Sequence, residues 1–173
     1  TGSNRNMVRN NMIYDIRSNT SIYGLYWYYG DAVCENNTFN FDHTTSNASG
    51  TTWAMYSYGN AQYPMDVNYN IVVLNRGGFS SKTGFYCPLS GNINFNRNDM
   101  YVVGTNTNYA YYNTNHANLA SLQGTGLNLN GWDVDPKYEQ LLRGQLNTVC
   151  DCAEYPRCHV LVRGDDVDSR SQG

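Results

Sequence analysis

Two short motifs recur four times each along the chain, and this repeat constrains the fold more strongly than any other feature. The first has the form apolar-x-x-Asn-x-apolar, and its asparagines are Asn11, Asn37, Asn70 and Asn98. The second has the form x-small-apolar-Tyr, and its tyrosines are Tyr26, Tyr56, Tyr86 and Tyr112. Successive copies lie 26 to 33 residues apart, which is the period of an architecture whose units pack each against the next.

The residues within each repeat predict short β-strands rather than helices. Segments 53–58, 67–74 and 83–87 are rich in β-branched and aromatic residues, alternate in polarity and are bounded by Gly and Asn. Two or three such strands, stacked on their neighbours at about 4.8 Å, make one coil of a parallel β-solenoid. The sequence therefore predicts an all-β fold in which equivalent residues of successive coils lie directly above one another.

We interpret the four repeated asparagines as an internal ladder at a recurrent turn. Asparagine tolerates the left-handed backbone conformation, and its side-chain amide can bond the equivalent group of the next coil. The alternative is four unrelated turn asparagines in a chain that contains many of them. The second motif carries more weight in this choice, because it recurs at similar spacing and fixes three columns.

Alternation along the strands assigns the side chains of each coil to an inner or an outer face. Three columns are expected to face the core: Leu25, Met55, Phe85 and Tyr111; Val8, Cys34, Val67 and Phe95; and Ile13, Phe39, Val72 and Met100. Two columns are expected to face outward: Gly24, Ala54, Gly84 and Ala110; and Tyr26, Tyr56, Tyr86 and Tyr112. If this orientation is inverted, the tyrosines belong to the core instead.

Charge and hydropathy exclude two classes of function. Charged residues make up 14% of the chain and the net charge is -3, whereas an electrostatic nucleic-acid binder needs a basic face that displaces counterions. No apolar run approaches the ~18 residues of a membrane span. We therefore expect neither nucleic-acid binding nor membrane insertion.

Four segments, YGLY, ENNTF, VNYNIVVLN and NRNDMYVV, are followed by a short helical pattern and by Asp133-Val134-Asp135-Pro136. This succession resembles the right-handed parallel β-helix proteins of the pectate-lyase-like superfamily, especially repeat regions of large secreted or cell-surface bacterial proteins. The resemblance covers about residues 4–138 and implies a right-handed parallel β-helix of about four to five coils with an extracellular location. It implies little about activity, because this superfamily includes lyases, hydrolases, adhesins and passive spacers.

The two ends of the predicted solenoid differ. Residues 115–123 predict a short helix with Asn115 as N-cap and Gly124 as its stop, and this helix would cover the last coil. No comparable cap precedes Arg5. We therefore expect further coils, or another chain, on the N-terminal side in the intact protein.

A change of composition after Tyr138 divides the chain into a β-helix at residues 1–138 and a tail of unassigned structure at residues 139–173. The tail contains a cluster that suggests either a zinc site or a disulfide: Cys150, Cys152, Cys158 and His159. The spacing C-x-C-x5-C-H is not a standard zinc pattern. We predict no metal and no cofactor.

An enzyme on this fold needs charged groups in equivalent columns of neighbouring coils, for Ca²⁺-assisted lyase chemistry or for hydrolysis by paired carboxylates. The charged candidates are Asp15, Asp42, Asp66, Asp99, Arg76, Lys82 and Arg97. Counted from the ladder asparagine of each repeat, they share no column. We predict no catalytic residues, and we keep a fragment of a polysaccharide lyase or glycoside hydrolase as the alternative function.

The tyrosine column predicts contact with carbohydrate. Four tyrosines would form an exposed ladder beside a shallow groove, with Tyr28 and Tyr58 two residues further along. Aromatic faces suit sugar rings, and phenol hydroxyls suit sugar hydroxyls. The alternative is that stacked tyrosines only stabilise the sheet. The sequence thus predicts a non-catalytic stalk or adhesin-like module of a secreted or surface bacterial protein, with polysaccharide as its partner.

Overall fold

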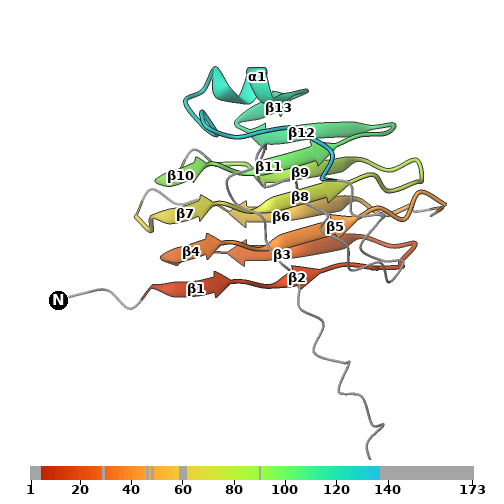
Figure 1. Cartoon of the computed structure of the whole chain (residues 1–173), viewed down its shortest axis with the longest axis horizontal. Coiled ribbons are helices and arrows are strands. Elements are labelled where there is room, and N and C mark those ends of the chain that lie inside the picture. Colours follow the sequence, from red (N-terminus) through yellow and green to blue (C-terminus); the bar gives the residue numbers. More distant parts are fainter. Residues whose placement is uncertain are drawn as a thin grey trace, which may run out of the picture. The chain divides into compact units, whose positions relative to one another are not determined.

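Four coils of three strands each wind through the part of the chain that the computed structural model describes, which is residues 5–136 without 29, 46, 48, 59–61 and 90. The predicted tail at 139–173, with its cysteine cluster, lies outside these described residues. The coils follow one another in Figure 1 from red to green. Their strands are β1 (Asn6–Arg9), β2 (Met12–Ile13), β3 (Ile22–Tyr28); β4 (Ala32–Glu35), β5 (Thr38–Phe41), β6 (Thr52–Tyr58); β7 (Met65–Asn68), β8 (Ile71–Leu74), β9 (Lys82–Cys87); and β10 (Ile93–Asn96), β11 (Asp99–Val102), β12 (Thr107–Tyr112).

Equivalent strands of successive coils pair in parallel and form three sheets. Sheet A has the order β1-β4-β7-β10, sheet B the order β2-β5-β8-β11, and sheet C the order β3-β6-β9-β12. One further strand, β13 (Thr114–His116), adds to β12 in antiparallel orientation. The chain is therefore a parallel β-solenoid of about four turns, and the fold class predicted from the repeat is confirmed.

A left-handed residue makes the corner between sheets A and B in every coil. The segment 67–74, predicted as one strand, divides into β7 and β8 at this corner, where Tyr69 has a φ of 59°. The other corner residues with positive φ are Asn10, Asn36 and Arg97. Each directly precedes a repeated asparagine. The repeated asparagines do not themselves adopt the left-handed conformation, contrary to the prediction. The residue before each of them adopts it instead.

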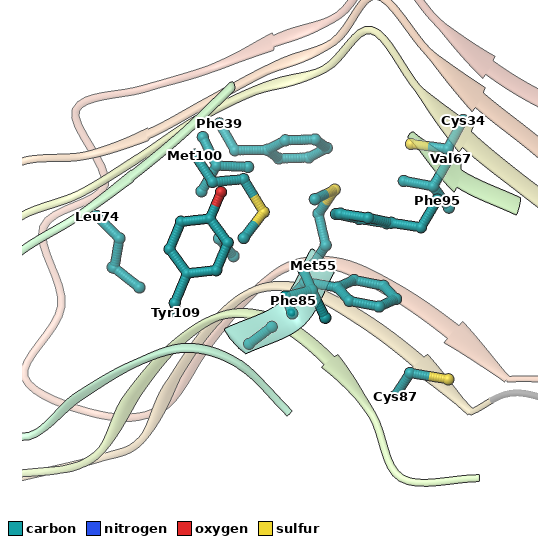
Figure 2. Packing of buried hydrophobic residues seen from close by; sticks show 14 of the residues in the cluster. Cys34, Phe39, Met55, Val67, Leu74, Phe85, Cys87, Phe95, Met100 and Tyr109 are labelled. Carbon is teal, nitrogen blue, oxygen red and sulfur yellow. The ribbon is translucent and has the colours of Figure 1, made fainter. Parts of the chain in front are cut away.

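The core lies between the three sheets, and Figure 2 shows side chains of all three pointing into it. Two predicted inner columns are buried from the second coil onward: Cys34, Val67 and Phe95 from sheet A, and Phe39, Val72 and Met100 from sheet B. Met55 and Phe85 of sheet C meet them, and the rings of Phe85 and Phe95 stack at 4.2 Å. Each large apolar side chain that is buried in this way contributes about 1.5–3 kcal/mol.

Sheet C departs from alternation at one position in every coil. The residue-by-residue pairing of neighbouring strands skips one residue in each strand of this sheet: Gly24, Ala54, Gly84 and Tyr109. Ala54 is 0% exposed, and a Cβ on Gly84 would lie 2.7 Å from the carbonyl oxygen of Tyr109 and 2.8 Å from Cγ2 of Val102. The prediction that Gly24, Ala54 and Gly84 face outward is therefore wrong, because they allow the strands of sheet C to approach sheet B closely. Ala110 is also buried, against the prediction.

The fourth coil is covered by β13 and a short helix, α1 (Leu119–Gln123). The N-cap is Asn118, whose side chain accepts a hydrogen bond from Ser121 N, and the helix ends at Gly124 as predicted. Asn115 is not the N-cap, because it belongs to β13 and pairs with β12. No helix in the described ranges is long and apolar enough to cross a membrane.

Candidate functional site

The repeated asparagines form a continuous chain of hydrogen bonds through the interior. The Nδ2 of Asn11 donates to Oδ1 of Asn37 at 2.9 Å, that of Asn37 to Oδ1 of Asn70 at 3.0 Å, and that of Asn70 to Oδ1 of Asn98 at 3.0 Å. Each Oδ1 also accepts the backbone N–H of the preceding asparagine. Asn128 continues the ladder beyond the last coil, because its Oδ1 accepts from Asn98 N.

The inner asparagines have no bonding capacity left for a ligand. The Nδ2 of Asn70 also donates to the carbonyl oxygens of Cys34 and Asn68, and Asn70 is 1% exposed. Burial raises the pKa of the neighbouring Cys34 thiol to about 12, which keeps it protonated and unreactive. The ladder is therefore a structural element, and a functional surface has to lie elsewhere.

The acidic residues do not come together into a catalytic cluster. Asp66 lies in sheet A opposite Val33 and Asn94, whereas Asp99 lies in sheet B opposite Ile71. Asp66 and Asp31 are both paired with Arg5. No group of three or more His, Cys, Asp or Glu side chains that suits a metal occurs within the described residues.

A column of stacked tyrosine rings lies on the outer face of sheet C. Ring centroids are 5.0 Å apart for Tyr26 and Tyr56, 5.0 Å for Tyr56 and Tyr86, and 4.8 Å for Tyr86 and Tyr111, with planes inclined by about 20° in each pair. The fourth ring is Tyr111 rather than the predicted Tyr112. The register places Tyr112 opposite Cys87, and it packs against the core.

Two shorter aromatic columns flank this one. Tyr28 lies 5.0 Å from Tyr58, as expected from their spacing. On the other side, Tyr23 stacks on Trp53 at 4.6 Å. We call the eight side chains together the tyrosine face: Tyr23, Trp53, Tyr26, Tyr56, Tyr86, Tyr111, Tyr28 and Tyr58.

The sequence analysis does not include Tyr23 and Trp53, and its assignment of Tyr111 to the core is wrong, because the register places Tyr111 opposite Tyr86 in the outer column. The signal for the first two was present, because the variable first position of the second motif is aromatic in the first two repeats. Strict alternation hides this signal, because it would put this position on the same side as the core residue Leu25. The irregular position at Gly24 lies between them and sends Tyr23 outward.

The tyrosine face offers hydroxyl groups and ring edges to solvent. Tyr26 and Tyr28 are 52% exposed and Tyr23 is 45% exposed. Within a column the ring faces are largely occupied by neighbouring rings, so the edges and hydroxyls are what remains for a ligand. Partial burial, followed by the neighbouring tyrosines, raises the pKa of Tyr56 and Tyr86. Their hydroxyls therefore stay protonated at neutral pH and can donate hydrogen bonds.

The tyrosine face also lacks charge. Lys82 is the single charged residue in β3, β6, β9 and β12, and it is 1% exposed. Its Nζ donates to the carbonyl oxygens of Gly78, Ser80 and Thr105, so the ammonium group is held in the interior. The outer face of sheet C is accordingly aromatic, hydroxyl-bearing and electrically neutral.

Comparison of the chain with protein-family models, with curated proteins and with solved structures finds no significant match. The class of protein therefore follows from the structure itself. It is a parallel β-solenoid with a buried asparagine ladder and an exposed aromatic face on one of its three sheets.

Proposed function

We propose that this chain is a non-catalytic solenoid module that binds polysaccharide through the tyrosine face. The observation that carries the proposal is the alignment of tyrosines from all four coils into one column on the outer face, with further aromatic side chains beside it. Tyr26 is exposed, and the other three rings of the column are partly exposed. Tyrosine combines an apolar ring with a hydroxyl donor, which matches the mixed apolar and hydroxyl surface of a sugar.

The face favours a neutral glycan that runs along the solenoid axis. The Tyr26 column has four rungs at about 4.8 Å, a length of roughly 15 Å, whereas the Tyr28 column has only two. A polyanion such as a uronate chain would find no exposed cation in the strands of this sheet. We expect affinity to rise with glycan length until the ligand spans the four rungs.

We further propose that the module belongs to a secreted or surface protein of bacterial type and is related to the parallel β-helix proteins of the pectate-lyase-like superfamily. Three parallel sheets in register make a rigid rod, which suits a stalk that presents its binding face at a distance. The placement is consistent with a ligand that occurs outside cells.

A lyase or hydrolase is the second candidate function. The dispersed positions of the carboxylates argue against it. A hydrolase needs two carboxyl groups on either side of one glycosidic bond. Asp66 and Asp99 belong to different sheets, and Asp66 is neutralised by Arg5.

A glycan array tests the proposal. The test variant carries Tyr26→Ala, Tyr56→Ala and Tyr86→Ala, and the matched control carries Tyr14→Ala, an exposed tyrosine outside the face. We expect the wild-type protein and the control to bind neutral glycans equally and the triple variant to bind at least about tenfold more weakly. Equal binding by the triple variant, or no binding by the wild-type protein, removes the proposal.

A further inference from the structure

The corner between sheets B and C of the third coil holds two buried cations. Arg76 follows β8 and is 3% exposed, and Lys82 opens β9 and is 1% exposed. Neither forms an ion pair with a carboxylate among the residues that the structure describes. Burial lowers the pKa of both groups, and the positive charge of Arg76 lowers the pKa of Lys82 further. Buried charges are costly without a counter-charge, so a negative partner at this corner would stabilise the fold.

Neutral oxygen atoms satisfy most of the donors of these two cations. Nζ of Lys82 directs all three of its N–H groups to backbone carbonyl oxygens. The terminal nitrogens of Arg76 donate to Oγ1 of Thr52 in the second coil. They also donate to the carbonyl oxygens of Ser18 and Thr20, which follow β2 of the first coil. Nε of Arg76, however, is buried and has no partner among the described residues, so one N–H of this guanidinium is left for a further acceptor.

His43 lies next to Arg76 in the neighbouring coil. Phe41 of the second coil pairs with Leu74 of the third, and both are in the core. Two residues further on, Gly77 N donates to the carbonyl oxygen of His43 at 3.1 Å, which continues the same register. Arg76 is thus stacked on His43. Nδ1 of His43 is also buried without a partner in the described part of the chain, so two nitrogen atoms that can donate lack an acceptor at this corner.

The carboxylate that is closest to His43 in sequence does not neutralise this corner. Asp42 directly precedes His43, but its Oδ2 accepts a hydrogen bond from Nδ2 of Asn40 at 3.2 Å. Asn40 alternates with the core residues Phe39 and Phe41, so the side chains of Asn40 and Asp42 belong to the outer side of sheet B. Among the described residues, the positive charge of the corner therefore stays uncompensated.

We propose that this corner binds a monatomic anion of the halide type, held between Nε of Arg76 and Nδ1 of His43. A halide accepts hydrogen bonds from several donors at once, and it supplies the negative charge that a water molecule in the same place lacks. It needs little more room than an ordered water molecule, which likewise requires two or more polar partners when it is buried. His43 is only partly buried, so the anion can exchange with solvent on the side of this residue.

Thermal unfolding of the whole chain in sodium chloride and in sodium gluconate at equal ionic strength tests the proposal. A ligand that binds only the folded state raises the midpoint of unfolding. We expect the midpoint to be about 3 °C or more higher in about 0.2 M chloride than in the same concentration of gluconate. His43→Phe keeps an aromatic ring but removes Nδ1, and it should abolish this difference. The matched control is Thr44→Ala at the exposed neighbouring residue, which should retain the difference.

A crystal of the unmodified protein grown in sodium bromide locates the anion directly. We expect an anomalous peak within hydrogen-bond distance of Nε of Arg76 and Nδ1 of His43. The absence of anomalous signal at this position overturns the proposal, because a water molecule would then satisfy the two nitrogens. Equal unfolding midpoints of the unmodified protein in the two salts also overturn it, as does a chloride effect that persists in His43→Phe.

Discussion

The asparagine ladder and the tyrosine column have the same periodicity but opposite relations to solvent. Both arise because parallel in-register pairing places equivalent residues of all four coils above one another. Asn37 and Asn70 are 1% exposed, and their side chains form hydrogen bonds with other groups in the interior of the solenoid. Tyr26 is half exposed and stacks on Tyr56.

The difference shows that regular stacking by itself does not indicate function. A buried polar ladder costs stability when one member is removed, because its partners lose their hydrogen bonds where water cannot replace them. An exposed aromatic column loses only some contact area, and water solvates whatever remains. Substitutions in the two columns should therefore separate structural from binding effects.

The largest effect is expected for Asn70→Ala. This change removes Oδ1, which accepts from N and Nδ2 of Asn37, and Nδ2, which donates to the carbonyl oxygens of Cys34 and Asn68, all within the core. We expect the free energy of unfolding to fall by about 4 kcal/mol. Urea denaturation measures the loss, and Asn11→Ala at the exposed end of the ladder is the control, with a loss of about 1 kcal/mol or less. Equal losses would contradict the ladder as a buried unit.

The next effect concerns the two faces of sheet C. Gly84→Ala puts a Cβ 2.7 Å from the carbonyl oxygen of Tyr109, a backbone atom that cannot move aside easily. We expect a loss of about 2–3 kcal/mol from overpacking, measured by thermal unfolding. Asn108→Ala, on the outer side of the neighbouring strand, should be nearly neutral. A neutral Gly84→Ala would mean that the small column faces outward, as simple alternation predicts.

A third prediction concerns the pH dependence of stability that arises from Asp99, which directly follows the ladder residue Asn98. Burial, followed by the negative charges of Asp133 and Asp135, raises the pKa of Asp99 to about 6, from an ordinary value near 4. Between these values the folded protein binds a proton that the unfolded chain has released, so stability falls as pH rises from about 4 to about 6, by about 2 kcal/mol.

Asp99→Asn should flatten this pH dependence and raise stability at pH 8, since the amide oxygen can still accept the hydrogen bond from Val134 N. Denaturation curves at several pH values compare the two proteins. Parallel curves between about pH 4 and 7 would show that the Asp99 carboxyl does not titrate in this window.

The smallest effect on stability is expected in the tyrosine column. Tyr56→Ala should lower the free energy of unfolding by about 1 kcal/mol, because cross-strand aromatic pairs contribute on this scale. Tyr56→Phe, which removes only the hydroxyl, should be nearly neutral for stability while it weakens glycan binding. A loss from Tyr56→Ala as large as that from Asn70→Ala would make the column structural and leave the proposed function without its basis.

Much of the fold follows from the sequence because the repeat fixes the register. Once Asn37 and Asn70 are aligned, the columns of Cys34 with Val67 and of Phe39 with Val72 follow from alternation alone. This inference is reliable because successive coils have the same structure. An alignment of residues deduced from one pair of coils can therefore be checked against the next pair.

The errors arise where a backbone irregularity breaks alternation. The residue column at Gly24 and Gly84 turns inward because two sheets approach closely there, and no property of glycine in the sequence distinguishes this from an exposed groove. In the fourth coil Tyr109 replaces the small residue, so the motif YAYY fits two registers and the sequence alone favoured the wrong one. The corner residues Tyr69 and Arg97 are also unusual, because neither residue type favours a positive φ.

The most direct test of the account is a nuclear Overhauser experiment on protein labelled with ¹⁵N at asparagine side chains. If the repeated asparagines occupy successive layers of one solenoid, the side-chain amide protons of Asn37 show cross-peaks to Asn11 and to Asn70, and those of Asn70 show cross-peaks to Asn98. Cross-peaks that connect the strands in antiparallel order, or asparagine amides without contact to one another, would contradict the solenoid and everything inferred from its two columns.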